Sequence, residues 1–345
     1  MTIRQLALLA KVSPATVSMA LGNHPRISVA TKARVRRLAR KHGYCVDGRV
    51  GELMRTIRAH SPMRPSGCLG VISLYPEPKP WETPGRVSLQ NHYRGMTARA
   101  TELGYRLEPF WVREPGIRPG RLRTIIETRG IQGLLCLGGP KLDEELPAEL
   151  HSFAIVTIGM SLSTRLHRVV THFSQNATRV LTMLQERGYR RPAALMKVYE
   201  DGRTAHLVAS MYLYFSRYIF EQIDIPIFYT DLQIDLKAFH RWFHRYRPDV
   251  IVYCEHTPFF PQLSDYLAQH GLRVPEDIGL AGIDCAVHPD WLSGVRQQTE
   301  QLGMNAVDML VGRVQQRDFG LPKMPKTEFV EGDWIDGSTL RPRPT

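Results

Sequence analysis

The sequence predicts an all-α head with a helix-turn-helix, joined to an α/β body of parallel sheets covered by helices, and three observations lead to that fold class. The first 64 of 345 residues hold 13 Lys and Arg against two acids, which gives +11, whereas the remainder carries only +1 of the total of +12. Residues 1–45 contain several short runs of apolar residues at helical spacing, separated by residues that cap helices. After residue 66, short apolar runs alternate with amphipathic stretches, as in sheets that helices cover on both faces.

The first two helices of the head are separated by a three-residue turn. Apolar residues at helical spacing predict a first helix over residues 3–10. Ser13 suits an N-cap and Pro14 suits a first helical position, so a second helix is expected over residues 14–21. Two helices joined by so short a turn form the helix-turn-helix pattern, whose second helix enters the major groove of DNA.

A third helix braces this pair. Ser28 suits its N-cap, Gly43 its exit, and Val35, Leu38 and Ala39 are expected to turn inward. The other face is basic and carries Arg34, Arg36, Arg37, Arg40 and Lys41. This charge favours docking on a polyanion, and a generic three-helix bundle is the alternative.

Four runs of the head stand at a specific spacing, namely residues 3–7, residues 12–18, Ile27-Ser28 and Gly43-Tyr44. Together they resemble the DNA-binding head of the LacI/GalR transcription regulators. The resemblance implies that Pro14, Ala15 and Met19 lie where base-reading side chains stand, and that Thr16 and Ser18 lie where phosphate or flanking base edges are bound. The residues expected to contact DNA are Ser13, Pro14, Ala15, Thr16, Ser18, Met19, Asn23, Arg26 and Leu53.

Met19 departs from that family, many of whose members place an Arg there to bind guanine. Met offers only apolar contact, and Pro14 and Ala15 have no hydrogen-bonding group in their side chains. We therefore expect base reading to depend on thymine methyl groups and DNA shape.

Leu53 matches the residue that the family inserts into the minor groove from a hinge helix. Val46 replaces the family's proline, and Gly48 and Gly51 each disfavour a helix by roughly 1 kcal/mol relative to Ala. A flexible linker with an incidental leucine is therefore the alternative.

A segment rich in Pro and Ser, residues 60–67, marks a domain boundary near residue 66. The expected domains are residues 1–45 for the head, 46–66 for the hinge and linker, and 67–340 for the body. Strands are predicted over residues 68–74, 131–137, 154–158, 193–196, 250–253 and 278–283, with helices over 89–103, 176–187 and 259–270.

Segments of the body carry a second resemblance, at residues 130–135, 156–159, 188–191, 271–278 and 282–284. They resemble the effector domain of the same family, which is similar to periplasmic sugar-binding proteins. The resemblance implies two lobes around a hinged cleft, about 67–170 with 298–325 and about 171–297 with 326–340. Crossings between the lobes are expected near residues 160–172, 290–298 and 322–328.

Ligands of open α/β sheets bind beyond the carboxyl ends of the strands. The residues expected to bind the effector are Ser73, Tyr75, Trp81, Arg203, His206, Glu255, His256 and Asp284. By resemblance, the Asp284 carboxylate holds sugar hydroxyls; an Asx-turn or helix cap is the alternative. Arg203 or His206 lies near the family's ligand-binding Arg, with a solvated charge as the alternative. His172 and residues 254–256 differ from the family's usual Asp and Asn-Asp, so the ligand's identity stays open.

The loop of residues 75–85 is rich in proline and carries Trp81. Trp81 is expected to stack on the face of a sugar, and an exposed loop or one that packs against another subunit is the alternative. The aromatic residues Tyr212, Tyr214, Phe215, Tyr218 and Phe220 are expected to pack a helix against a sheet.

No catalytic constellation is recognised, so neither an enzyme nor a cofactor is expected. The sequence lacks G-x-G-x-x-G, Walker, H-E-x-x-H and G-x-S-x-G motifs. His240 and His244 stand four apart on a predicted helix, where an exposed polar face is favoured over a metal site. The five cysteines are scattered, which indicates reduced thiols.

Residues and resemblance together predict a sequence-specific DNA-binding transcriptional regulator, expected to be a repressor controlled by a sugar or sugar derivative in the cleft. A homodimer on a near-palindromic operator of double-stranded DNA is expected, because a two-fold protein imposes two half-sites. The alternatives are a sugar- or nucleoside-processing enzyme with a DNA-binding appendage and a nonspecific DNA-coating protein. Without a secretory signal or a long apolar run, the protein is expected in the cytoplasm and off the membrane.

Overall fold

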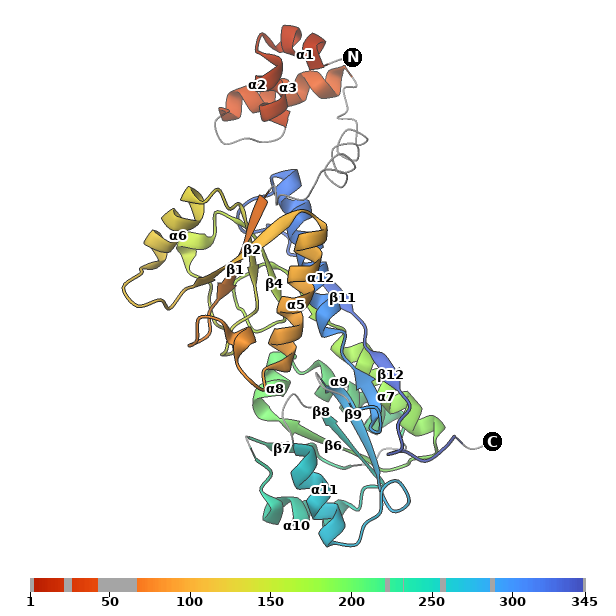
Figure 1. Ribbon diagram of the computed structural model, residues 1–345. Helices are drawn as coiled ribbons and strands as arrows, with labels where there is room; N and C mark the ends of the chain where they lie inside the picture. Colours follow the sequence, from red (N-terminus) through yellow and green to blue (C-terminus); the bar gives the residue numbers. More distant parts are fainter. Residues whose placement is uncertain are drawn as a thin grey trace.

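The computed structural model describes residues 3–21, 27–42, 67–220, 224–231, 233–254, 259–285 and 289–343. In the head these ranges form α1 (Ile3–Ala10), α2 (Pro14–Leu21) and α3 (Val29–Lys41) (Figure 1). The bounds of α1 and α2 agree with the sequence prediction. The hinge with Leu53, together with Asn23, Arg26 and Gly43, lies outside the described residues.

Hydroxyl caps and a small apolar core hold the head together. The Ser13 hydroxyl oxygen accepts a hydrogen bond from the backbone N–H of Thr16 at 3.1 Å, and that of Ser28 accepts one from Thr31 at 3.2 Å. The buried core consists of Leu6, Ala7, Ala10, Val17, Ala20, Val35 and Ala39. Leu38 is half-buried and packs against this core, so the predicted inward side of α3 is confirmed.

The first lobe of the body is a parallel sheet in the order β11-β5-β4-β3-β1-β2. Its strands are β1 (Gly67–Ser73), β2 (Tyr105–Trp111), β3 (Gly133–Cys136), β4 (Ala154–Ile158), β5 (His167–Thr171) and β11 (Thr327–Val330). Its helices are α5 (Val87–Glu102), α6 (Pro119–Thr128), α12 (Thr299–Gln316) and the short 3-10 helices η1 (Pro80–Glu82) and η2 (Ala148–Leu150).

The second lobe is a sheet in the order β12-β10-β9-β8-β6-β7, in which only the edge pair β12 and β10 is antiparallel. Its strands are β6 (Pro192–Lys197), β7 (Phe228–Thr230), β8 (Val250–Cys254), β9 (Gly279–Cys285), β10 (Ser293–Arg296) and β12 (Asp333–Ile335). Its helices are α7 (Phe173–Glu186), α8 (Val198–Arg203), α9 (Leu207–Tyr218), α10 (Leu236–Tyr246) and α11 (Phe259–Gln269).

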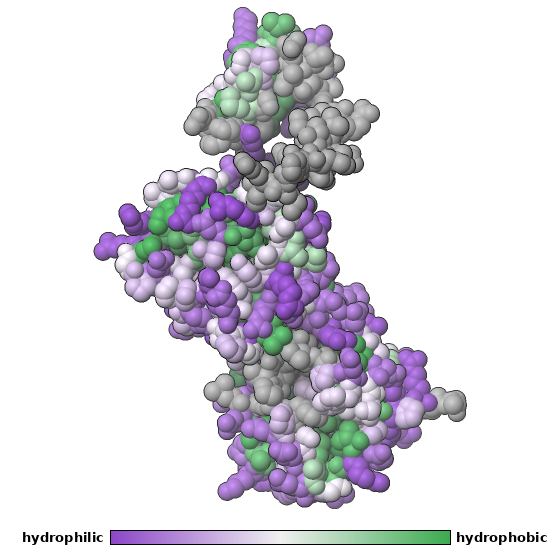
Figure 2. Space-filling model, in the orientation of Figure 1, coloured by the Kyte–Doolittle hydropathy of each residue, from purple (hydrophilic) through white to green (hydrophobic). Residues whose placement is uncertain are grey.

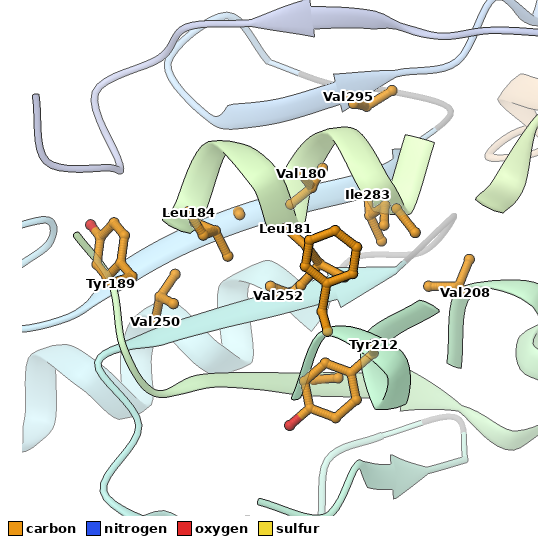
Figure 3. Packing of buried hydrophobic residues seen from close by; sticks show 14 of the residues in the cluster. Val180, Leu181, Leu184, Tyr189, Val208, Tyr212, Val250, Val252, Ile283 and Val295 are labelled. Carbon is orange, nitrogen blue, oxygen red and sulfur yellow. The ribbon is translucent and has the colours of Figure 1, made fainter. Parts of the chain in front are cut away.

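Apolar side chains fill both faces of each sheet, which explains why the central strands read as continuous apolar runs. In β8, Val250 and Val252 point into one core, whereas Ile251 and Tyr253 point into the core on the other face. Figure 3 shows the first of these cores, in which Val180, Leu181 and Leu184 of α7 lie over the strands. The predicted α/β fold with helices on both faces is therefore confirmed.

The aromatic run of α9 divides between the core and the surface. Tyr212, Phe215 and Phe220 are buried as expected, but Tyr214 and Tyr218 are 52% and 70% exposed. The prediction that all five pack inward is wrong because a helix presents only one side to the sheet.

The chain crosses between the lobes three times, at residue 172, at residues 297–298 and at residues 331–332. The first two crossings fall where they were expected. The third falls later than the expected stretch of residues 322–328, because β11 pairs in parallel with β5 and completes the first sheet.

Two glycines bring α5 and α12 into very close contact. A Cβ atom on Gly95 would collide with the backbone carbonyl of Glu300, and one on Gly303 would collide with that of His92. The two helices therefore pack backbone to backbone in the first lobe. Helix α12 is also the first element of the first lobe after the chain returns from the second lobe.

No helix among the described ranges is long and apolar enough to span a membrane. The face shown in Figure 2 is mostly hydrophilic, with hydrophobic residues gathered in limited patches.

Gly303→Ala is expected to destabilise the body by about 1–3 kcal/mol, because α5 and α12 must move apart. Gly312→Ala in the same helix is the matched control, since nothing lies within 4 Å of its added Cβ. The control should gain up to about 1 kcal/mol from helix propensity. Urea unfolding of both variants measures the difference, and equal stability of the two would contradict the close packing.

Candidate DNA interface and interlobe cavity

Helix α2 presents a largely apolar edge to solvent. Pro14 and Ala15 are exposed, and Met19 is half-buried. The Thr16 hydroxyl forms a hydrogen bond of 2.8 Å with the Ser13 hydroxyl. Both hydroxyls therefore take part in the N-terminal cap of α2. The side chain of Ser18 lies outside the described residues.

Helix α3 supplies a strong positive field beside this edge. It contains six Lys and Arg and no acid. The five residues predicted to form its basic face, Arg34, Arg36, Arg37, Arg40 and Lys41, are all exposed. A surface of this charge is suited to attract the phosphates of a nucleic acid.

A cavity of about 870 Å³ lies between the two lobes of the body. Tyr75 and Arg86 line it from the first lobe, Lys197 and Arg203 line it from the second, and Gln297 lines it from a crossing. Volume and position are those of a pocket for a small organic ligand. Among the predicted effector residues, Tyr75 and Arg203 line it.

The loop after β1 positions Tyr75. The Ser73 hydroxyl donates to the carbonyl of Glu77 at 3.1 Å and accepts from the N–H of Tyr75 at 3.3 Å. Arg86 pairs with Glu77 at 2.5 Å and lies 5.0 Å from the centre of the Tyr75 ring. Ser73 is therefore a buried support of the cavity wall, and the prediction that it binds the ligand directly is not supported by its position.

Burial raises the pKa of the Tyr75 hydroxyl, and the nearby Arg203 and Arg86 guanidinium groups partly oppose that rise. Tyr75 therefore remains a protonated hydroxyl at neutral pH and can donate as well as accept a hydrogen bond.

Helix α8 carries the second wall of the cavity and also reaches the first lobe. The guanidinium of Arg203 lies 5.6 Å from the ring centre of Tyr199, and both side chains line the cavity. The Tyr199 hydroxyl donates to the carbonyl of Pro140 across the cleft. The two lobes therefore touch beside the cavity, so the width of the cavity depends on this contact.

The described lining combines both signs of charge with hydroxyl, amide and apolar groups. Glu200 and Asp231 provide carboxylates, Ser88 and Thr171 provide hydroxyls, and Phe173 provides an aromatic wall. Donors and acceptors beside an aromatic surface suit a polyhydroxylated ligand.

Trp81 does not face this cavity. It is 6% exposed in η1 and stacks on Tyr93 of α5, with ring centroids 4.3 Å apart and planes within 4°. The expected stacking on a sugar is wrong because the indole is already packed within the core of the first lobe. The rest of the loop agrees with the alternative of an exposed loop, since Pro76, Pro78 and Pro84 are exposed.

His206 also lies away from the cavity. Its backbone has a positive φ of 59° at the start of α9, and its Nδ1 lies 2.8 Å from a carboxylate oxygen of the buried Asp201. The side chain is 67% exposed, so the expected ligand contact does not occur here. Glu255 and His256 lie outside the described residues.

Asp284 is buried next to the crossings rather than on the cavity wall. One carboxylate oxygen accepts from Asn176 Nδ2 at 2.7 Å, and its backbone carbonyl accepts from the amide of Gln297. The Asn176 Oδ1 atom in turn accepts from the N–H of Gly332 at 3.0 Å. The structure thus favours a structural role for Asp284, with Gln297 as the member of this network that reaches the cavity.

Burial raises the pKa of Asp284 to about 7, and the hydrogen bond from Asn176 only partly opposes this. Among the described residues its second carboxylate oxygen has no hydrogen-bond partner. Ionisation of this group is therefore costly in the folded protein.

Several cavity residues were missed by sequence reasoning, chiefly Lys197, Tyr199, Phe173 and Gln297. Lys197 and Tyr199 come directly after the apolar run of β6. Because ligands bind beyond the carboxyl ends of parallel strands, this position could have predicted both residues. Phe173 and Gln297 stand at crossings, which apolar patterning alone does not mark. His172, which replaces the family's Asp, caps α7 through its ring nitrogen.

The described residues contain no group of three or more His, Cys, Asp or Glu arranged to hold a metal ion. His240 Nδ1 lies 3.0 Å from the hydroxyl of Tyr266, and the ring centroids of His240 and His244 are 4.2 Å apart on the exposed side of α10.

Comparison with known proteins agrees with both parts of this architecture. Residues 2–47 match the family of bacterial regulatory proteins, lacI family, and residues 181–333 match the periplasmic binding protein-like domain. No curated protein matches the sequence significantly. The head therefore matches the DNA-binding domain of the lacI family, and the body matches the periplasmic binding protein-like domain.

Solved structures of such regulators share the fold along nearly the whole chain. A complex of the transcriptional regulator CelR with cellobiose is 20% identical, with a TM-score of 0.60, and the match covers 98% of this chain and 99% of that one. The Lac repressor dimer bound to operator and the anti-inducer ONPF is 17% identical, with a TM-score of 0.59 and 99% of both chains covered. CcpA of Lactococcus lactis is 14% identical, with a TM-score of 0.55, over 81% of this chain and 100% of that one.

Asp284→Asn is expected to change the pH dependence of stability. The pKa of this carboxyl rises from 3.8 to about 7 on folding, so between these pH values the folded state binds more protons than the unfolded state. The folded protein therefore loses stability as pH rises through that window. Three pKa units correspond to about 4 kcal/mol at most. The variant should therefore gain in melting temperature over the wild type more at pH 8 than at pH 5. An equal difference in melting temperature between variant and wild type at pH 5 and pH 8 would show that Asp284 does not titrate between these pH values.

Proposed function

We propose that the protein is a transcriptional repressor that binds a near-palindromic operator as a homodimer and changes its operator affinity when a sugar or sugar derivative occupies the interlobe cavity. The observation that carries the proposal is the cavity of about 870 Å³, which both lobes and a crossing line with polar side chains. A ligand that contacts both lobes stabilises one relative placement of them over others.

The lining of the cavity supports the choice of ligand class. Tyr75, Thr171 and Gln297 offer neutral donors and acceptors, and Arg203 with Glu200 offers one group of each charge. The regulator CelR forms a complex with cellobiose, and a further structural relative from Alkaliphilus metalliredigens is complexed with D-xylulofuranose. A neutral, polyhydroxylated sugar therefore suits this cavity, whose charged groups carry both signs, better than a strongly charged ligand.

The first lobe is the part of the body through which ligand binding reaches the DNA. Its strand β1 begins at Gly67, directly after the expected linker, and ends at the loop that carries Tyr75 into the cavity. Movement of this strand on ligand binding therefore changes the spacing of two heads in a dimer, which is a coupling between two separate sites.

Two copies are proposed because a single half-site engages only one short recognition helix, α2. A two-fold pair of heads doubles the contact and imposes a near-palindrome. The Lac repressor, a structural relative, forms a dimer bound to operator.

We infer that the cavity binds its ligand without transforming it, in keeping with the regulators to which the chain is similar. The alternative of a sugar-processing enzyme requires turnover. A ligand recovered unchanged after prolonged incubation with the protein supports the regulator, and a new product supports the enzyme.

The function is tested by binding-site selection on random duplex DNA, followed by footprinting of the selected site. Protection of one discrete, near-palindromic site is expected, whereas uniform coating of DNA would contradict sequence-specific binding. Ala15→Ser and Met19→Arg are expected to change the selected bases, because each adds a hydrogen-bonding group to the exposed edge of α2. Thr178→Ala on α7 of the body is a control that should leave the selected sequence unchanged.

Ligand control is tested by a thermal-shift screen of sugars, followed by operator titration with each sugar that stabilises the protein. Arg203→Ala is expected to weaken ligand affinity about 10- to 100-fold, the effect of losing a hydrogen bond to a charged group. Operator affinity without ligand should stay unchanged. Arg118→Ala, an exposed change on the first lobe, is the matched control. Equal ligand affinities of the Arg203→Ala and Arg118→Ala variants would show that Arg203 does not contact the ligand.

A further inference from the structure

The outer side of α10 carries an unusual concentration of positive charge. Lys237, Arg241, Arg245 and Arg247 are all exposed, and together they are named here the basic face of α10. No acidic residue occurs between residues 236 and 248. The body as a whole is nearly neutral, so this charge is a local feature of the second lobe.

Neighbouring carboxylates do not neutralise the basic face. Within the described residues, none of its four side chains has a carboxylate oxygen within 4.0 Å. Elsewhere on the body, Arg99 and Arg123 meet such partners, at 2.9 Å from Asp308 and 2.8 Å from Glu127.

The two acids that flank α10 are occupied by backbone groups. Asp235 accepts from the N–H groups of Lys237 and Ala238, both at 3.0 Å, and so caps the helix. Asp249 accepts from the N–H groups of Arg190 and Arg191 at 2.7 and 2.9 Å. Neither carboxylate is therefore free to fold over the basic face.

The basic face stands on a rigid support. On the inner side of α10, Phe239, Trp242 and Phe243 are buried, and the Phe239 ring lies 5.0 Å from that of Tyr266 on α11. Arg191 donates to the carbonyls of Tyr246 and Arg247, which ties down the end of the helix. Because the backbone is held in this way, a partner that binds the cations has only their side chains to order.

The spacing of the cations indicates what binds them. Lys237, Arg241 and Arg245 stand four residues apart, so they project from one side of the helix at intervals of about 6 Å. Carboxylates four residues apart on a second helix have the same interval, and Arg binds a carboxylate through two parallel hydrogen bonds.

We propose that the basic face of α10 is a docking surface for an acidic, helical segment of a partner protein. The proposal is independent of the ligand that the cavity takes. Helix α10 lies in the second lobe, at the end of the body remote from the start of β1 (Figure 1). A partner seated there leaves the interlobe cavity uncovered, since no residue of α10 lines that cavity.

Two other occupants fit the basic face less well. A second copy that met the same face by two-fold symmetry would oppose four cations to four. DNA is usually held by hydroxyl and amide side chains and free helix N-termini in addition to cations, but α10 has no Ser, Thr, Asn or Gln, and Asp235 occupies its N-terminus.

The test uses the full chain and a fluorescein-labelled helical peptide with Glu at every fourth position among Ala and Gln, with excess duplex DNA to occupy the basic head. Fluorescence anisotropy measures peptide binding. The variant Lys237→Glu, Arg241→Glu, Arg245→Glu should bind at least about tenfold more weakly than the wild type, because three charge pairs become repulsive. The matched control Arg118→Glu, Arg121→Glu, Lys323→Glu makes the same change of charge on exposed residues of the first lobe and should bind as the wild type does.

Equal weakening in both triple variants would show that only net charge matters and would overturn the proposal. Peptide binding that appears only without duplex DNA, together with weaker DNA binding by the α10 variant, would assign the face to nucleic acid instead. A change of oligomeric state in the α10 variant would assign it to a subunit interface. If that variant misfolds by circular dichroism, Arg241→Gln and Arg245→Gln singly provide the test, with about threefold losses expected.

Discussion

A buried amide at the crossings holds the body together, and the rest of the structure depends on it. The side chain of Asn176 donates to the carboxylate of Asp284 at 2.7 Å and accepts from the backbone of Gly332 at 3.0 Å. Gln298 donates to Asp333 at 2.6 Å and ties the second crossing to the third. Because the first two of these contacts are short and buried, the crossings cannot separate without leaving polar groups unpaired.

This constraint places the cavity where a ligand can act on both lobes. Gln297 donates to the backbone carbonyl of Asp284 at the crossings and also lines the cavity. One residue therefore connects the cavity to the crossings. Tyr199 and Pro140, which also line the cavity, join the lobes a second time through their hydrogen bond. The glycine contacts between α5 and α12 hold these two helices of the first lobe backbone to backbone.

Only part of the cavity could be predicted from the sequence, and the wrong predictions have a common cause. Tyr75 was predicted because it follows the end of a strand, and Arg203 because the resemblance places it near a ligand-binding Arg; both line the cavity. Trp81 and His206 were misplaced because a sequence shows that a side chain is able to bind, but not whether Tyr93 or Asp201 already engages it. Six strands were missed, namely β2, β5, β7, β10, β11 and β12. Four of them, β2, β7, β11 and β12, lie at sheet edges, where the apolar run is interrupted. The other two, β5 and β10, are short inner strands in which Arg168 and Arg296 interrupt the apolar run.

The sequence by itself determined the class of the protein. Caps such as Ser13 and Ser28 and the spacing of apolar residues are local properties, so they specify the helices of the head and the alternating α/β body. The charge of +11 on the first 64 residues likewise needs no fold to be read. Only the tertiary structure decided which polar residues meet, since Asp284 stands 108 positions from Asn176, and no local rule determines whether a carboxylate ends in a cavity or in a buried hinge.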